Sequence, residues 1–130
     1  MEKIVFTNGC FDLLHRGHLY VLEEASKLGK LIVGLNSDES VNRLKGDKRP
    51  LQSQERRKKI LEGLDFVEKV LIFYEDTPLK LIMEVRPDII VKGGDYEVNG
   101  VVGRELVEEV IIIPLLEGYS TTAILKKIGD

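Results

Sequence analysis

Short apolar runs alternate with segments of helical periodicity along the whole chain, and this alternation is what most constrains the fold. The apolar runs cover residues 4–7, 31–35, 70–73, 89–91 and 110–113. Most of them are continuously apolar, as expected of parallel strands that are covered on both faces. Strands that alternate with helices predict a parallel sheet with helices on both sides. We therefore expect a single α/β domain over residues 1–130, with a doubly wound parallel sheet of five strands.

Two of the helical segments have clear boundary signals. Residues 19–28 carry apolar side chains at helical spacing, and Gly29 follows as a stop signal. Ser53 can cap a second helix, which should end near Gly63. Both helices are expected to pack on the predicted sheet.

Two further helices and one loop complete the prediction. Thr77 can cap a helix that has Pro78 at its first position, and Ser120 can cap the last helix of the chain. Residues 45–50 are the one polar and basic stretch, which we expect to be a loop. Doubly wound sheets bind ligands at the carboxyl ends of their strands, near the point where the strand order reverses.

Composition narrows the class of protein. A net charge of -3 gives no general footprint for nucleic acid, so a protein that handles small molecules is the better expectation. Cys10 is the only cysteine, which excludes a disulfide within the chain and fits a reducing compartment. We find no secretory leader and no run of about 20 apolar residues, so we expect a cytoplasmic protein without a membrane partner.

The only two histidines, His15 and His18, lie three residues apart directly after the first predicted strand, with Gly17 between them. At the start of a helix this spacing places both imidazoles on one face. Gly17 opens the backbone to a ligand, and the helix N-terminus adds free N–H groups and partial positive charge. The pattern predicts a phosphate-binding corner. A metal site is the weaker alternative, because Asp12 is the only obvious third ligand.

The segment from Gly9 to His18 resembles the HxGH signature of the cytidylyltransferase-like nucleotidyltransferases. Ser120-Thr121-Thr122 resembles their second signature, a Ser-Thr-Thr sequence that opens the C-terminal helix. The resemblance covers essentially the whole chain and implies a Rossmann-like sheet. A finer resemblance, to the domain that makes ADP-heptose from ATP and D-glycero-D-manno-heptose 1-phosphate, is carried by residues 8–12, 43–46 with 49–50, 91–96 and 117–122.

This resemblance implies the reaction and its participants. A phosphate oxygen of the substrate attacks the α-phosphorus of the nucleotide, and pyrophosphate leaves without a covalent enzyme intermediate. Mg²⁺ is expected on the nucleotide phosphates and not on ligands of the protein. In many bacteria the heptose domain is fused to a sugar kinase, so the resemblance implies a separate kinase as a partner here. Members of the family commonly form homodimers.

The resemblance also implies roles for individual residues. The expected catalytic residues are His15, His18 and Lys45. The expected nucleotide-binding residues are Asn8, Gly9, Cys10, Phe11, Gly17, Gly93, Asp95, Tyr119, Ser120, Thr121 and Thr122. The expected substrate-binding residues are Asp12, Arg49, Arg56 and Lys92. Arg56 can equally be one member of a solvated basic run over residues 56–59.

Three other functions stay open. Glycerol-3-phosphate cytidylyltransferases, which use CTP, are similar in length and plan. They typically carry threonine where Cys10 stands, and arginine where this chain has Leu115-Leu116, so adenine is favoured here. Adenylation of a flavin or pantetheine phosphate is a third possibility within the superfamily. A nucleotide-binding module without catalysis belongs to another class, and the intact signature argues against it.

Overall fold

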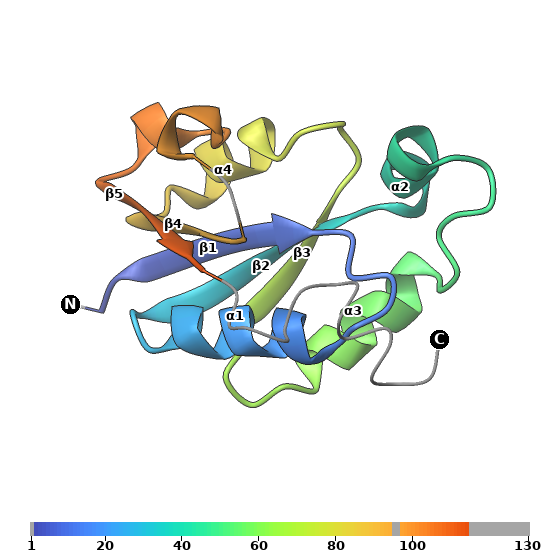
Figure 1. The fold of residues 1–130 in the computed structure, drawn as a ribbon, viewed down its shortest axis with the longest axis horizontal. Coiled ribbons are helices and arrows are strands. Elements are labelled where there is room, and N and C mark those ends of the chain that lie inside the picture. The colour runs from blue at the N-terminus through green and yellow to red at the C-terminus, as the bar shows by residue number, and fades with distance from the viewer. Residues whose placement is uncertain (1, 95–96, 115–130) are drawn as a thin grey trace.

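A computed structural model describes residues 2–94 and 97–114, and this part of the chain contains a five-stranded parallel sheet (Figure 1). The strands are β1 (Ile4–Gly9), β2 (Lys30–Asn36), β3 (Lys69–Phe73), β4 (Ile89–Gly93) and β5 (Glu109–Ile113). Their order in the sheet is β3-β2-β1-β4-β5, and every neighbouring pair is parallel. The predicted α/β fold and its five strands are confirmed.

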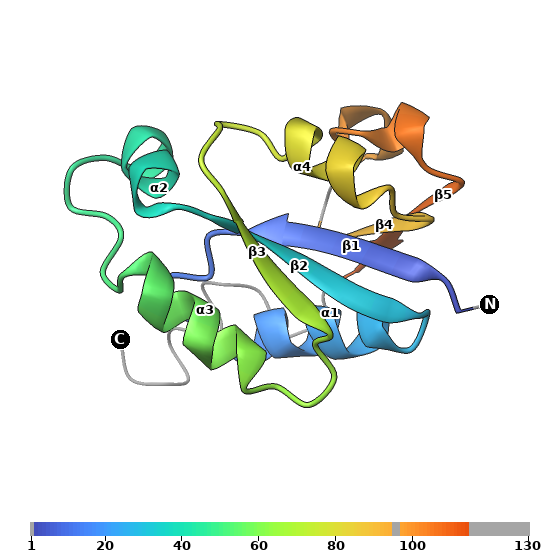
Figure 2. The ribbon, with the colours of Figure 1, turned by 180° about the vertical axis from the view of Figure 1, so that it is seen from behind.

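Helices cover both faces of the sheet, as predicted (Figures 1 and 2). The α-helices are α1 (Arg16–Ser26), α2 (Asp38–Lys45), α3 (Gln54–Glu62) and α4 (Leu79–Val85), and two short 3-10 helices are η1 (Val98–Gly100) and η2 (Arg104–Leu106). Helices α1 and α3 lie on one face, whereas α4 lies on the other with the two 3-10 helices. The helix predicted after Ser120 lies outside the described residues.

Helix α2 was missed by the sequence analysis, which expected only a basic loop around its end. Ser37 caps it, because its hydroxyl accepts a hydrogen bond from the N–H of Ser40 at 3.1 Å. Only Ser40 and Val41 of this helix are buried. A short helix with so little apolar surface has no periodic stripe to reveal it.

Two other boundaries also differ from the prediction. Helix α1 begins at Arg16, three residues earlier than expected, because His15 takes the extended N-cap conformation. The N-cap of α4 is Pro78 and not Thr77, so the proline lies just before the helix and not at its first position. The predicted cap at Ser53 is confirmed by its hydrogen bond from the N–H of Arg56.

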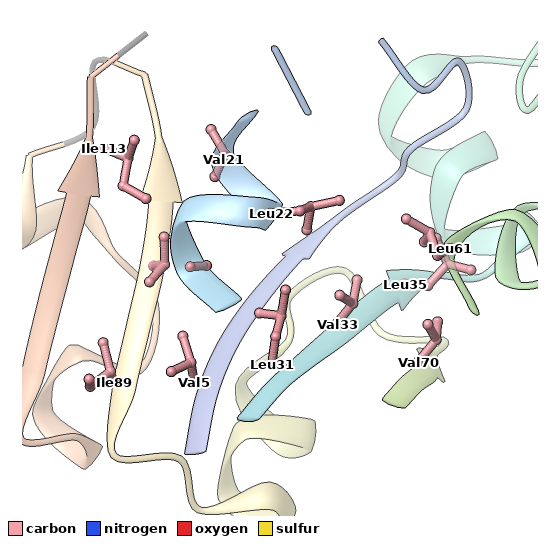
Figure 3. Packing of buried hydrophobic residues seen from close by; sticks show 12 residues of the cluster. Val5, Val21, Leu22, Leu31, Val33, Leu35, Leu61, Val70, Ile89 and Ile113 are labelled. Atoms are coloured by element: carbon pink, nitrogen blue, oxygen red, sulfur yellow. The ribbon is translucent and has the colours of Figure 1, made fainter. Parts of the chain in front are cut away.

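The core has two parts, one on each face of the sheet. Neighbouring residues of β1 point to opposite sides, so Val5 joins the cluster beneath α1 and α3 while Phe6 joins the cluster beneath α4. Figure 3 shows the first cluster, in which Val21 and Leu22 of α1 lie over the strands. Burial on both faces explains why the strand sequences are continuously apolar.

The strand order reverses at β1. The chain passes from β1 to β2 and β3 on one side, and then returns to place β4 and β5 on the other side. Connections that leave in opposite directions open a crevice at the carboxyl ends of β1 and β4. Among the described residues, no helix has the length and apolar character needed to span a membrane.

Candidate functional site

A pocket of about 230 Å³ lies at this reversal point. Its lining residues come from the end of β1, the following loop, the first turns of α1 and the end of β4: Thr7, Asn8, Gly9, Cys10, Phe11, His15, Gly17, His18, Val21, Leu22, Lys92 and Gly93. The structure therefore brings together nine of the residues that the sequence analysis assigned to the site. Asp95, Tyr119, Ser120, Thr121 and Thr122 lie outside the described residues.

The two histidines stack on one face of α1. Their ring centroids are 3.7 Å apart with an angle of 17° between the planes, so the sequence-based placement is confirmed. The backbone N–H of His15 donates to Nδ1 of His18 at 3.3 Å. A ring nitrogen that accepts a hydrogen bond carries no proton, so Nε2 is the N–H donor of the neutral His18 ring.

Burial keeps both imidazoles neutral at pH 7. Burial, the nearby charge of His15 and the charge of Lys45 lower the pKa of His18 to about 4, although a hydrogen bond to the backbone of Leu13 opposes this shift. Burial also lowers the pKa of His15. The Nδ1 atom of His15 is buried and has no hydrogen-bond partner among the described residues. Two neutral N–H-bearing rings beside a helix N-terminus suit a phosphate group.

Phe11 supports the histidine pair from the preceding loop. Its ring stands edge-on to His18, with centroids 5.2 Å apart. Its φ of 48° lies in the left-handed region, which a bulky residue adopts at a cost of about 1–3 kcal/mol. The ring also fills the space above Gly9, where an added Cβ would come within 3.0 Å of Cε2 of Phe11. The surrounding structure must therefore hold Phe11 in this conformation.

Lys92 brings an ammonium group to the pocket from β4. Its Nζ donates to Oδ1 of Asn8, at the end of β1, at 2.7 Å. Burial lowers the pKa of Lys92 to about 8. The site therefore joins a cation that ionises close to physiological pH with two neutral imidazoles.

The structure explains why residues 93 and 94 are glycines, and the sequence analysis did not identify these reasons. A Cβ on Gly93 would lie 2.5 Å from Cγ2 of Val21, so α1 packs directly against the end of β4. Gly94 has a φ of 99°, which side-chain-bearing residues rarely adopt. Close approach of a nucleotide remains a prediction for this segment.

Asp12 was expected to contact substrate, but its carboxylate accepts hydrogen bonds from donors of the chain itself. The residue is only 5% exposed, and its carboxylate accepts the N–H groups of Leu51 and Gln52 and an N–H of Arg49 at 3.1 Å. Burial would raise the pKa of Asp12, but these hydrogen bonds and the Arg49 charge outweigh it and lower the pKa. Asp12 and Arg49 pair with each other, and neither lines the pocket.

Lys45 and Arg56 are both exposed and also lie outside the pocket lining. Lys45 is the last residue of α2, not part of a loop, and its charge still contributes to the low pKa of His18. Arg56 lies on α3, where its Nε donates to Oε1 of Gln52 at 3.2 Å. Their predicted roles remain predictions.

Cys10 contributes a thiol, a strong nucleophile when it is ionised, to the pocket lining. Burial raises the pKa of its thiol, with the charges of Lys45 and Arg57 opposing. Since the thiolate is the reactive form, this environment disfavours covalent chemistry at Cys10.

Arg57 is the residue that sequence reasoning missed. The sequence places it in the solvated basic run over residues 56–59, yet it is 1% exposed and donates to the carbonyl oxygens of Cys10 and Asn36. A signal was available, because Arg57 stands one turn before Leu61, and these are the two buried residues of α3.

The described donors suit phosphate better than a protein-bound metal. In residues 2–94 and 97–114, no three His, Cys, Asp or Glu side chains come together in a way that could hold a metal ion. Imidazole and ammonium N–H groups instead provide hydrogen bonds to anionic oxygens.

Comparisons with known proteins show the family of this chain. A family model described as cytidylyltransferase-like matches residues 6–127. The protein named "Bifunctional protein HldE" from Campylobacter concisus (strain 13826) is 56% identical over 130 residues, which are 99% of this chain and 28% of that protein. The protein of the same name from Wolinella succinogenes is 58% identical over 128 residues, or 98% of this chain and 27% of that protein. The chain thus spans about a quarter of the length of these relatives.

Solved structures match the fold. The structure described as the lipopolysaccharide core biosynthesis protein from Thermoplasma volcanium has a TM-score of 0.75 and 28% identity, covering 89% of this chain and 99% of that chain. Pantothenate synthetase from Thermus thermophilus has a TM-score of 0.60 and 18% identity, covering 88% of this chain and 56% of that chain. The second likeness shows the fold alone.

Proposed function

Since this chain belongs to the cytidylyltransferase-like family, we propose that it transfers AMP from ATP to D-glycero-D-manno-heptose 1-phosphate and releases pyrophosphate. The observation that carries this proposal is the pocket in which both histidines and Lys92 meet at the carboxyl ends of β1 and β4. The acceptor is supported by the likeness to the lipopolysaccharide core biosynthesis protein and by the sequence resemblance to ADP-heptose-forming domains. The likeness to proteins called bifunctional fits a domain that is often fused to a kinase.

The reaction is an in-line displacement at phosphorus. A phosphate oxygen of the heptose 1-phosphate attacks the α-phosphorus of ATP, and the bond from that phosphorus to the bridging oxygen of pyrophosphate breaks. The leaving pyrophosphate takes the electron pair. The task of the protein is to align two anions and to stabilise the charge that develops between them.

The histidines perform the second part of this task. The Nε2–H of His18 and the ring of His15 donate hydrogen bonds to phosphate oxygens, beside the free N–H groups at the start of α1. An incoming anion favours the protonated imidazole, so nucleotide binding opposes the effect of burial on the pKa of His18. Charge therefore accumulates in the pocket when there is a phosphate to balance it.

The cations take the remaining phosphate charge. Lys92 binds the phosphate of the acceptor, and Lys45 reaches the triphosphate from the end of α2. Mg²⁺ bound with the nucleotide supplies further charge neutralisation on the phosphate oxygens. The nucleotide roles of Asp95 and of residues 119–122 remain part of the proposal.

The proposal also includes a homodimer, a separate sugar kinase as partner and a cytoplasmic location.

The test is pyrophosphate release with Mg²⁺ in four pairings of ATP or CTP with heptose 1-phosphate or glycerol 3-phosphate. Turnover restricted to ATP with heptose 1-phosphate is the expected result. Turnover restricted to CTP with glycerol 3-phosphate would overturn the acceptor and the base but leave the displacement intact. Two further acceptors, pantetheine phosphate and a flavin phosphate, are then tested with ATP. Nucleotide binding without pyrophosphate release for any of these acceptors would overturn catalysis.

Substitution of the histidines tests the mechanism directly. His15→Ala and His18→Ala should each lower kcat by roughly 10²–10³, because each removes a donor to the developing charge. Glu23→Ala is the matched control, since Glu23 is an exposed residue of the same helix. Steady-state pyrophosphate release measures all three. Unchanged kcat in both histidine variants would exclude the proposed role of this pocket.

A further inference from the structure

Arg57 is the largest fully buried side chain in the described part of the chain. Its side chain is fully buried and forms four hydrogen bonds, yet Arg57 does not line the pocket. Nη1 donates to the carbonyl oxygens of Cys10 and Asn36, both at 2.8 Å, and Nε donates to the carbonyl of Gln52 at 2.9 Å. Nη2 donates to Oδ1 of Asp38 at 2.8 Å.

These four acceptors come from separate segments on the side of the sheet where the strands end. Cys10 follows β1, Asn36 ends β2, Asp38 begins α2, and Gln52 precedes α3. Arginine offers five donors in one rigid plane, so a single side chain can satisfy carbonyls on several segments at once. The Asp38 side chain, which is 42% exposed, supplies the one formal counter-charge.

The loop that leads to the histidines is held at two points. Arg57 holds the carbonyl of Cys10, and Gln52 binds Asp12 twice, through its N–H to Oδ1 and through Nε2 to the Asp12 carbonyl. Since Arg57 also binds the carbonyl of Gln52, the two anchors are connected. The residue between the anchors is Phe11.

Phe11 transmits this constraint to the pocket. Its left-handed backbone persists only where the surroundings over-determine it, and the anchored residues on both sides provide that restraint. Its ring stands edge-on to His18, which in turn stacks on His15. A continuous set of contacts therefore connects the buried guanidinium with both imidazoles.

We propose that Arg57 is a positioning residue for the phosphate site: it fixes the loop around Phe11 and so the orientation of His18, without touching substrate. The alternative is that Arg57 only stabilises the fold. The two roles differ in what happens at His18 when Arg57 is changed in a protein that remains folded. The kinetic part of the test rests on the proposed function, whereas the spectroscopic part does not.

The main variant is Arg57→Lys, which keeps the charge but cannot reach all four acceptors. Lys59→Met is the control on α3, because Lys59 is exposed. With only two histidines in the chain, ring-nitrogen NMR can follow both titrations in the free protein. In Arg57→Lys the pKa of His18 should move upward from about 4, because a loosened Phe11 exposes the ring. Lys59→Met should titrate as the parent protein does.

The kinetic prediction for Arg57→Lys is that kcat and KM change by different amounts. Misplacement of the histidines should lower kcat by about 10–100-fold, with KM changed much less, because transition-state contacts suffer most. If Arg57→Lys does not fold, Asp38→Ala removes the one carboxylate partner at a half-exposed position and should shift the His18 titration in the same direction.

Two results are decisive. A folded Arg57→Lys protein with the parent His18 titration would overturn the positioning role, as would an unchanged titration in Asp38→Ala where it is the variant used. If His18 shifts while no substrate pairing gives turnover even in the parent protein, the proposed function fails and the positioning role stands.

Discussion

The lowered pKa of His18 makes the stability of the protein depend on the phosphate pocket. Burial, together with the charges of His15 and Lys45, lowers its pKa from 6.5 to about 4, so between these pH values the unfolded chain binds a proton that the folded protein does not. Stability attributable to this group therefore rises with pH across that window and is lost as the pH falls. The pocket keeps its donors neutral and in doing so reduces stability in acid.

We expect His18→Gln to flatten this dependence. The free energy of unfolding of the parent protein should fall by about 1–2 kcal/mol more than that of the variant between pH 6.5 and 4.5. Urea denaturation at several pH values measures the difference. Glu23→Ala should keep the parent slope, and equal slopes for His18→Gln and the parent would show that burial of His18 is not the cause.

Lys92 is charged in the folded protein at neutral pH, unlike His18, but its lowered pKa makes stability depend on pH in the same direction. Its folded pKa of about 8 lies below its ordinary 10.5, so the folded protein binds fewer protons here between those values and stability rises with pH. Below pH 8 the buried ammonium destabilises the free protein. Such destabilisation at a pocket residue is expected where a ligand's negative charge later offsets it.

Lys92→Met should therefore stabilise the free protein by about 1 kcal/mol at pH 7, with the advantage shrinking towards pH 10. The same change should raise the KM for the acceptor about tenfold or more, because a charge-assisted hydrogen bond is lost. Thermal unfolding and initial rates test both parts, with exposed Lys80→Met as the control. A destabilised variant with normal acceptor KM would contradict the assignment.

At the scale of elements, the contact between α1 and β4 determines the position of the helix that carries the histidines. An added Cβ on Gly93 would lie 2.5 Å from Cγ2 of Val21. Valine in a helix has essentially one rotamer, so the clash cannot be relieved by rotation of the side chain. The absence of a side chain at Gly93 is what allows α1 to approach the sheet at the pocket.

Gly93→Ala should accordingly destabilise the protein by about 1–3 kcal/mol. Val21→Ala removes the clashing methyl groups, so the double variant should be more stable than the sum of the two single effects allows. Chemical denaturation of the four proteins of this cycle gives the coupling energy. Simple additivity would mean that α1 does not press on Gly93.

At the scale of the whole molecule, the reversal of strand order at β1 brings the site residues together. Asn8 and Lys92 are 84 positions apart in the chain, yet they join across neighbouring strands at a distance of 2.7 Å. Asp12 and Leu51 are 39 positions apart and are joined by a hydrogen bond of 2.9 Å. The pocket is therefore a product of the topology, because its lining comes from β1, the loop after it, α1 and β4.

Local pattern was sufficient for most of the architecture. Five strands, the cap at Ser53 and the stacking face of His15 and His18 all follow from features found within one segment, because burial imposes a period on neighbouring residues. Helix α2 was not predicted because it buries only two of its residues. Its cap at Ser37, followed by two acidic residues, was the weaker signal that remained.

The alternation of strands and helices, apart from α2, and the placement of the two histidines at a helix start were already specified by the amino-acid sequence. The burial of Arg57 and the binding of Asp12 to the backbone at residues 51–52 became apparent only in the folded chain. Periodicity and capping depend on residues within a few positions of one another, so a local pattern reveals them. A buried hydrogen bond depends on which strand ends the fold makes neighbours, and no local pattern specifies that.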